Sequence, residues 1–242
     1  GKRLNSLNQL ELLNRFLYLL NCLLKNINSG LLHNFSIKRI CTKCCLYIFI
    51  KGGVGKTRLS DELYYYYTRQ NVPVSLYSFD GQYKNRNNDK KVDNPEVAVV
   101  DTPGRIMDDK TIQTIQGADV VVIPTRLTGG NIESFTRTVS LVKENTDCPI
   151  VIIANGTNRF TASASFMEWL QKYRQKETLD VVMTIPQSEV LVQAENYSCS
   201  VNEINKHSPA TQAVNMMCDK ISALAGLPVE KRETKSKKLI AK

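Results

Sequence analysis

The chain has 242 residues, of which 42% are hydrophobic, and this length and composition suit one large α/β domain with short appendages and exclude an unfolded polar chain. The formal charge of +9 suggests a nucleic-acid partner, but the charge is concentrated at the ends: residues 1–45 hold seven Lys and Arg against one acid, and residues 229–242 hold six against two. Residues 46–228 hold nineteen against twenty, so the central part of the chain is close to neutral.

Residues 1–45 form a basic N-terminal extension that is rich in Leu and Asn. Apolar residues recur there at helical spacing, at positions 4, 7, 10, 13, 17, 20, 24 and 27, which predicts an amphipathic helix. The apolar run of residues 16–24 is interrupted by Asn21 and is too short to span a bilayer. Two interpretations stay open: a helix that binds a partner or a second copy, and a segment that lies upstream of the natural start.

The seven cysteines are scattered along the chain, and their odd number without a secretory signal indicates free thiols in a reducing compartment. Cys41 and Cys44 have the C-x-x-C spacing, but neither a second cysteine pair nor a histidine cluster accompanies them at zinc spacing. The sequence therefore does not indicate a metal held by cysteines.

A glycine-rich turn joins a predicted buried strand, residues 46–50, to a predicted helix, residues 57–70. Glycines at positions 52, 53 and 55 permit positive φ angles and let backbone N–H groups approach an anion, while the helix N-terminus adds partial positive charge. Lys56 supplies a mobile ammonium for terminal phosphates, and Thr57 supplies a hydroxyl ligand for Mg²⁺. The stretch predicts a phosphate-binding loop.

Residues 51–57, K-G-G-V-G-K-T, resemble the deviant Walker A signature of the ParA and MinD family of P-loop ATPases. Ile50 stands where the usual phosphate loop has its first glycine, and Lys51 matches the signature lysine of the family. The resemblance covers residues 46–228, is nearest to the short ParA-like partition ATPases, and implies a P-loop NTPase domain. Its expected α/β fold is a mainly parallel, twisted sheet with helices on both faces.

The second predicted strand, residues 74–79, ends at Asp80. Residues 78–82 are similar to the D-x-D-P-Q motif of the family, in which Asp80 matches the second aspartate and Gln82 the glutamine. Ser78 and Gly81 replace the first aspartate and the proline, so the catalytic carboxylate is kept while the local geometry departs from the family pattern.

The third predicted strand, residues 96–100, is followed by Asp101-Thr-Pro-Gly104. An aspartate at the carboxyl end of a buried parallel strand lies beside the phosphate loop, where it orients Mg²⁺ through a water. This stretch resembles the Walker B and switch II sequence of the family, which implies that the Gly104 N–H lies near the γ-phosphate.

Strands predicted at residues 118–124, 149–154 and 181–185 alternate with helices predicted at residues 131–144, 162–174 and 208–224, a pattern typical of a parallel sheet. Thr125 and Arg126 follow the first of these strands at the same sheet edge, and Thr125 is a candidate for lining the site. Arg126 is interpreted either as a phosphate or ion-pair contact or as a solvated surface charge. Asn155 ends the next strand and matches the adenine-reading asparagine of the family, although Asn before Gly is also a common turn former.

The resemblance implies ATP and Mg²⁺ as cofactors and assigns roles to the matching residues. Lys51, Lys56 and Asp80 are implied to be catalytic: Lys51 reaches the nucleotide of a second subunit, as an arginine finger does, and Asp80 positions or deprotonates the attacking water. The implied metal ligands are Thr57, Asp101 and Asp80. The implied nucleotide contacts are Gly52, Gly53, Val54, Gly55, Lys56, Thr57, Arg58, Gly104, Asn155 and Pro186.

The function implied by the resemblance is a cytoplasmic, bacterial ATPase that forms an ATP-dependent homodimer and partitions plasmid or chromosomal DNA. Its partners would be nonspecific DNA, which brings it to the nucleoid, and a centromere-binding ParB-like adaptor that stimulates hydrolysis. The basic ends are interpreted either as phosphate contacts or as solubilising tails. The flexible tail, residues 229–242, has few bulky apolar residues, so no stable membrane anchor is expected.

Two alternative functions stay open. A MinD-like or other positioning ATPase for a division, flagellar, pilus or conjugation apparatus would share every catalytic residue. A non-hydrolysing nucleotide-binding scaffold is suggested by Ser78 and Gly81, and by Arg58 at a position where small hydroxyl residues are usual.

Overall fold

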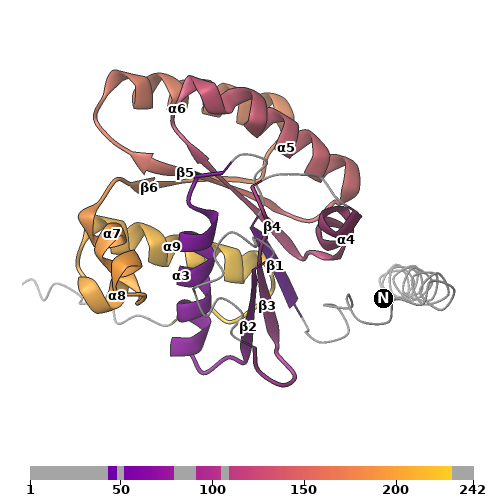
Figure 1. The fold of residues 1–242 in the computed structure, drawn as a ribbon. Helices are drawn as coiled ribbons and strands as arrows, with labels where there is room; N and C mark the ends of the chain where they lie inside the picture. The colour runs from indigo at the N-terminus through magenta and orange to yellow at the C-terminus, as the bar shows by residue number, and fades with distance from the viewer. Residues whose placement is uncertain (1–42, 48–51, 79–90, 105–108, 231–242) are drawn as a thin grey trace, which may run out of the picture. The chain divides into compact units, whose positions relative to one another are not determined.

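Six parallel strands lie side by side in one sheet in the described part of the chain, in the order β2-β3-β1-β4-β5-β6 (Figure 1). The strands are β1 (Lys43–Tyr47), β2 (Val74–Ser78), β3 (Val97–Asp101), β4 (Val120–Arg126), β5 (Ile150–Thr157) and β6 (Val181–Pro186). Strand β1 pairs with β3 on one side and β4 on the other, so the chain forms β2 and β3 on one side of β1 and then crosses to form β4 on the other side. Ligands of such sheets bind at the carboxyl ends of the strands next to this switch point.

The computed structural model describes residues 43–47, 52–78, 91–104 and 109–230, all of which belong to the unit Ile37–Lys242. Most of the N-terminal extension and nearly all of the basic tail lie outside the described residues, as do Lys51, Asp80 and Gln82. None of the helices in the described part of the chain combines the length and the apolar character that crossing a bilayer requires.

The helices cover both faces of the sheet (Figure 1). One face is covered by α3 (Lys56–Arg69), α7 (Glu189–Asn196), α8 (Val201–Ile204) and α9 (Pro209–Leu224), and the other by α4 (Asp109–Gly117), α5 (Ile132–Asn145) and α6 (Thr161–Glu177). The mainly parallel sheet with helices on both faces, expected from the alternation of predicted strands and helices, is confirmed.

Alternate residues of the central strands enter opposite layers of the core. Val120 and Val122 of β4 pack in the layer under α3 and α9, whereas Val121 and Ile123 pack in the layer under α5 and α6. All four side chains are fully buried. Because successive side chains of a strand point to opposite faces, a sheet covered on both sides needs apolar residues at every position, and this explains the unbroken apolar runs of the central strands.

Two elements differ from the sequence-based expectations. Strand β1 begins at Lys43, inside the segment assigned to the extension and earlier than the expected residues 46–50. Lys43 is accommodated at the strand end because its ammonium lies 3.8 Å from the Asp119 carboxylate. Helix α4 was not expected, because its sequence DKTIQTIQG has two bulky apolar residues, Ile112 and Ile115, which are too few to give a recognisable helical period.

Candidate functional site

The loop before α3 has the backbone of an anion-binding turn. Gly53 and Gly55 have φ angles of 77° and 95°, in the left-handed region that favours glycine. Gly55 is the N-cap of α3, and its carbonyl accepts the first helical hydrogen bond, from the Leu59 N–H at 3.0 Å. The N–H groups of the first turn therefore point out of the helix, where the positive end of its dipole favours an anion.

Gly55 also allows a close approach between this loop and strand β5. A Cβ atom on Gly55 would lie 2.3 Å from Asn155 Nδ2, a separation that real side chains do not tolerate. The position therefore requires glycine for two reasons, its backbone angle and its neighbour. Gly52, by contrast, has open space around it.

Thr57 and Asp101, both predicted to hold Mg²⁺, lie together. The Thr57 hydroxyl donates to Asp101 Oδ2 at 2.6 Å, which joins the first turn of α3 to the end of β3. The Asp101 side chain is 1% exposed, whereas Thr57 is half-buried. Hydroxyl and carboxylate oxygens are ligands that Mg²⁺ prefers, so these residues fit a magnesium ion that is shared with phosphate oxygens. In the described part of the chain no group of three or more His, Cys, Asp and Glu is arranged to hold a metal alone.

Replacing Thr57 tests this pair of oxygens. Thr57→Val keeps the shape of the side chain but removes the hydroxyl, so we expect the enhancement of nucleotide affinity by Mg²⁺ to fall by about tenfold, the effect of one lost bond to a charged group. Nucleotide affinity measured with Mg²⁺ and with a chelator gives this enhancement directly. Thr57→Ser, which keeps the hydroxyl, is the matched control and should retain the enhancement; an unchanged enhancement in Thr57→Val would contradict the assignment.

The other predicted phosphate and nucleotide contacts lie at the same edge of the sheet. Lys56, the first residue of α3, is buried. Val54 is buried in the apolar layer under α5 and α6, which anchors the loop. Gly104 follows β3 and is half-buried, and Pro186 is the last residue of β6, beside the bond from the Gln187 N–H to the Thr157 carbonyl at 2.9 Å.

Two strand ends hold the carbonyls of the phosphate loop. Arg126 Nε donates to the Gly53 carbonyl at 3.2 Å, and Asn155 Nδ2 donates to the Val54 carbonyl at 2.9 Å. The asparagine predicted to read the adenine thus directs its amide nitrogen to the loop. Thr125, predicted to line the site, is fully buried, and its hydroxyl donates to the Arg126 carbonyl at 3.3 Å.

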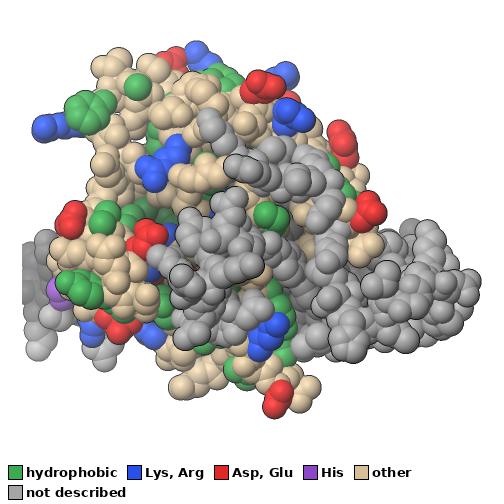
Figure 2. All heavy atoms as spheres, viewed as in Figure 1, with side chains coloured by type: hydrophobic (Ala, Val, Ile, Leu, Met, Phe, Trp, Pro, Cys, Tyr) green, Lys and Arg blue, Asp and Glu red, His purple; other side chains and the backbone are tan. Residues whose placement is uncertain are grey.

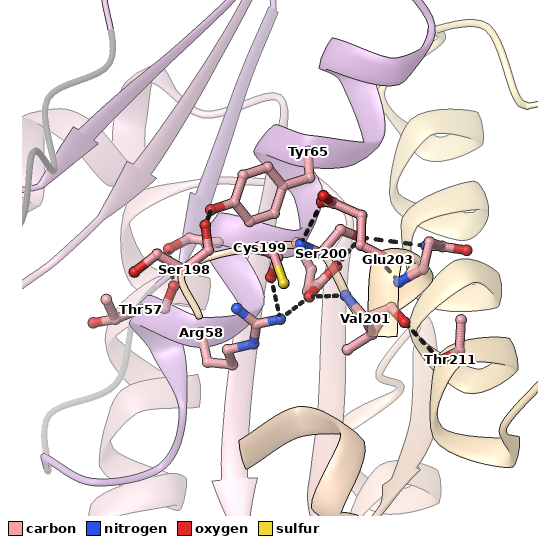
Figure 3. A network of polar contacts seen from close by, with 12 residues as sticks. Thr57, Arg58, Tyr65, Ser198, Cys199, Ser200, Val201, Glu203 and Thr211 are labelled. Carbon is pink, nitrogen blue, oxygen red and sulfur yellow. Dashed lines mark hydrogen bonds and ion pairs between the residues drawn. The ribbon is translucent and has the colours of Figure 1, made fainter. Parts of the chain in front are cut away.

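The side chain of Arg58 is engaged away from the nucleotide contact that was predicted for it. Its guanidinium bonds Glu62 on the next turn of α3 and donates to the Cys199 carbonyl at 3.1 Å (Figure 3). Both partners of this ion pair are buried, Arg58 at 8% and Glu62 at 1% exposure. What remains for a nucleotide at position 58 is the backbone N–H in the first turn of the helix.

Glu62, which was not predicted as a site residue, connects α3 to the start of α8. Its carboxylate accepts the Ser200 hydroxyl and the Val201 N–H, each at 2.9 Å. Burial raises the pKa of Glu62, while Arg58, Val201 and Ser200 oppose this shift because they stabilise the charged form. The spacing of Arg58 and Glu62, four residues apart in a helix, was the available sequence signal.

Comparisons with known proteins show which proteins the chain is similar to. A family model described as the CobQ/CobB/MinD/ParA nucleotide binding domain matches residues 47–201. Among curated protein sequences, none matches the chain.

Several solved structures share the fold. Apo McdA from Cyanothece is 16% identical, with a TM-score of 0.61 over 74% of this chain and 98% of that chain. MinD cell division protein from Aquifex aeolicus is 16% identical, with a TM-score of 0.56 over 78% of this chain and 100% of that chain. A putative plasmid partition protein from Borrelia burgdorferi, bound to AMPPNP, is 19% identical, with a TM-score of 0.53 over 75% and 97%. At these identities the likeness shows the fold.

Proposed function

Because the chain belongs to the family of CobQ/CobB/MinD/ParA nucleotide-binding domains, we propose that it is an ATPase that pairs with a second copy across bound ATP and uses hydrolysis to partition plasmid or chromosomal DNA. The nucleotide site rests on one observation, the bond between Thr57 and Asp101 beside the glycine loop. ATP and Mg²⁺ are supported by relatives of the same fold that were solved with ATP, with Mg-ADP and with AMPPNP.

In this proposal the residues at the start of α3 bind the phosphates. Lys56 and the N–H groups of residues 52–58 contact the phosphate oxygens, with Arg58 contributing through its backbone. Thr57 and Asp101 hold Mg²⁺, which when bound adds positive charge where the transferred phosphate becomes more negative. The Gly104 N–H lies near the terminal phosphate, and Pro186 flanks the nucleotide.

Lys51 and Asp80 lie outside the described residues, and their proposed roles rest on the sequence resemblance. A phosphate that loses its bond develops charge on its oxygens, and one lysine with Mg²⁺ leaves part of that charge unneutralised. Lys51 of one subunit would supply the missing charge to the nucleotide of the other, so hydrolysis would require the dimer. Asp80 would orient the attacking water and assist in holding the metal.

The DNA-partition role is supported by the fold likeness to the Borrelia burgdorferi protein and by the basic ends of the chain. Among the described residues on the face shown in Figure 2, Lys and Arg are scattered among Asp and Glu rather than gathered in one patch. Nonspecific DNA contacts are assigned to residues 1–45 and 229–242 because the basic charge of the chain is concentrated there, and a ParB-like adaptor would stimulate release. The fold likeness to McdA and to MinD cell division protein favours a second candidate, a positioning ATPase for another cargo.

The Lys51→Ala variant tests the proposed dimer-dependent hydrolysis. We expect the rate of phosphate release from Mg-ATP to fall by about a hundredfold or more, the effect of removing one group that stabilises transition-state charge, while nucleotide binding persists. Phosphate release with and without DNA, together with the mass of the ATP-bound species in sedimentation, measures both properties.

The outcomes separate an ATPase from a non-hydrolysing scaffold. Lys91→Ala, which removes one exposed lysine outside the loop, is the control for loss of charge and should turn over as the unmodified protein does. No phosphate release by the unmodified protein, with DNA or without it, would refute the ATPase and leave the scaffold. Equal turnover in Lys51→Ala and the unmodified protein would refute the lysine acting between subunits.

A further inference from the structure

Arg126 and Asn155 act on two consecutive peptide groups of the phosphate loop. Arg126 is the last residue of β4, Asn155 lies in β5, and the two are register partners across these strands. The carbonyls that they bond, those of Gly53 and Val54, are adjacent in the chain. Two neighbouring strand ends thus hold two neighbouring loop carbonyls.

The planarity of the peptide group gives these bonds a consequence for anion binding. In a trans peptide the C=O and the following N–H point in opposite directions. A Gly53 carbonyl held by Arg126 therefore directs the Val54 N–H away from β4, and a Val54 carbonyl held by Asn155 directs the Gly55 N–H away from β5. Both N–H groups are fixed on the side of the loop opposite the two strands.

Each member of the pair has its own support. Asn131, which is 4% exposed, donates its amide Nδ2 to the Arg126 carbonyl at 3.1 Å and so fixes the backbone that carries the guanidinium. Asn155 is held against Gly55, where only a residue without Cβ fits.

We propose that Arg126 and Asn155 are positioning residues that hold the phosphate loop in its anion-binding conformation, an inference that rests on the proposed nucleotide binding. They act on the loop through its carbonyls rather than on the nucleotide itself. The loop needs these two hydrogen bonds because Gly53 and Gly55, which permit its conformation, also permit many other backbone conformations. The ligand class is a polyphosphate, whatever base it carries.

The experiment compares ATP with inorganic tripolyphosphate, which has the phosphates but no base. We expect Arg126→Ala and Asn155→Ala each to raise the dissociation constant about threefold to tenfold, the effect of one lost hydrogen bond. The factor should be the same for ATP and for tripolyphosphate. The melting temperature without ligand should change little, because Arg126 is exposed and Asn155 half-buried at the sheet edge.

Two matched controls come from α5. Arg137→Ala removes an exposed arginine, and Asn145→Ala removes an amide that donates to a backbone carbonyl, that of Leu141, at 2.9 Å. Both should bind ATP and tripolyphosphate as the unmodified protein does. Arg126→Lys keeps the charge without the fixed Nε–H donor and should not restore affinity.

Each other outcome refutes a defined statement. If Asn155→Ala raises the dissociation constant for ATP but not for tripolyphosphate, Asn155 contacts the base and its proposed positioning role is wrong. Full recovery in Arg126→Lys would reduce Arg126 to a nearby charge and overturn its positioning role. If the unmodified protein binds neither ligand, the proposed nucleotide binding itself is wrong. If both alanine variants bind ATP and tripolyphosphate normally, only the positioning role of Arg126 and Asn155 is wrong.

Discussion

The Glu62→Ala variant is expected to lose about 3–5 kcal/mol of stability, because removing one partner of a buried ion pair leaves the other charge uncompensated. Arg58 would keep its charge in a site that is 8% exposed, and the Val201 N–H and Ser200 hydroxyl would lose their acceptor. For a domain of this size the melting temperature should fall by roughly 6–20 °C. Thermal and denaturant unfolding measure the loss.

Two comparisons show whether burial is the cause. Glu168 and Lys172 form an ion pair with the same i, i+4 spacing at an exposed position, at 2.8 Å, so Glu168→Ala should have little effect. The double variant Arg58→Met with Glu62→Leu removes both charges and should recover part of the loss, although the Val201 N–H stays without its acceptor. A loss in Glu62→Ala no larger than that in Glu168→Ala would contradict this account.

The Gly55→Ala variant is expected to weaken nucleotide binding by about tenfold or more, because two costs combine there. An alanine at a φ of 95° is strained by about 1–2 kcal/mol. Its Cβ would also lie 2.3 Å from Asn155 Nδ2. The amide would have to move away, which breaks its hydrogen bond to the Val54 carbonyl. Isothermal titration with ATP or ADP measures the effect.

The neighbouring glycines separate these two costs. Gly53 has a φ of 77° but open space where a Cβ would lie, so Gly53→Ala has the backbone strain without a steric clash. Gly52 has open space and no left-handed φ, so Gly52→Ala has neither cost. We expect the nucleotide affinity to decrease from Gly52→Ala to Gly53→Ala to Gly55→Ala. The affinity of Gly52→Ala should be close to that of the unmodified protein. Equal affinity in Gly53→Ala and Gly55→Ala would show that the contact with Asn155 is unimportant.

Much of the fold could be predicted from the sequence because its strands are buried on both sides. Such strands are unbroken apolar runs, and the runs ending at Asp101 and Arg126 were recognised within two residues of their bounds. Helix α4 could not be predicted in this way, since it buries one face with few apolar side chains. The four-residue helix α8 is too short to show any period.

The site was predictable where chemistry is local in the sequence and less so where it depends on distant partners. That Asp101 lies beside the phosphate loop followed from two motifs, each of which comes directly after a predicted strand. That Arg58 turns to the Cys199 carbonyl, and that Asn155 bonds the loop, depend on contacts between residues more than a hundred positions apart. No local pattern specifies such contacts.

The bond between Glu62 and Val201 also bears on how the protein is made. Val201 follows Glu62 by 139 residues. At about 5–20 residues per second, a ribosome needs roughly 7–28 s to synthesise the intervening chain. During that time Arg58 and Glu62 lack their partners at residues 199–201. Helix α3, which follows the phosphate loop, therefore reaches its final surroundings only late in translation.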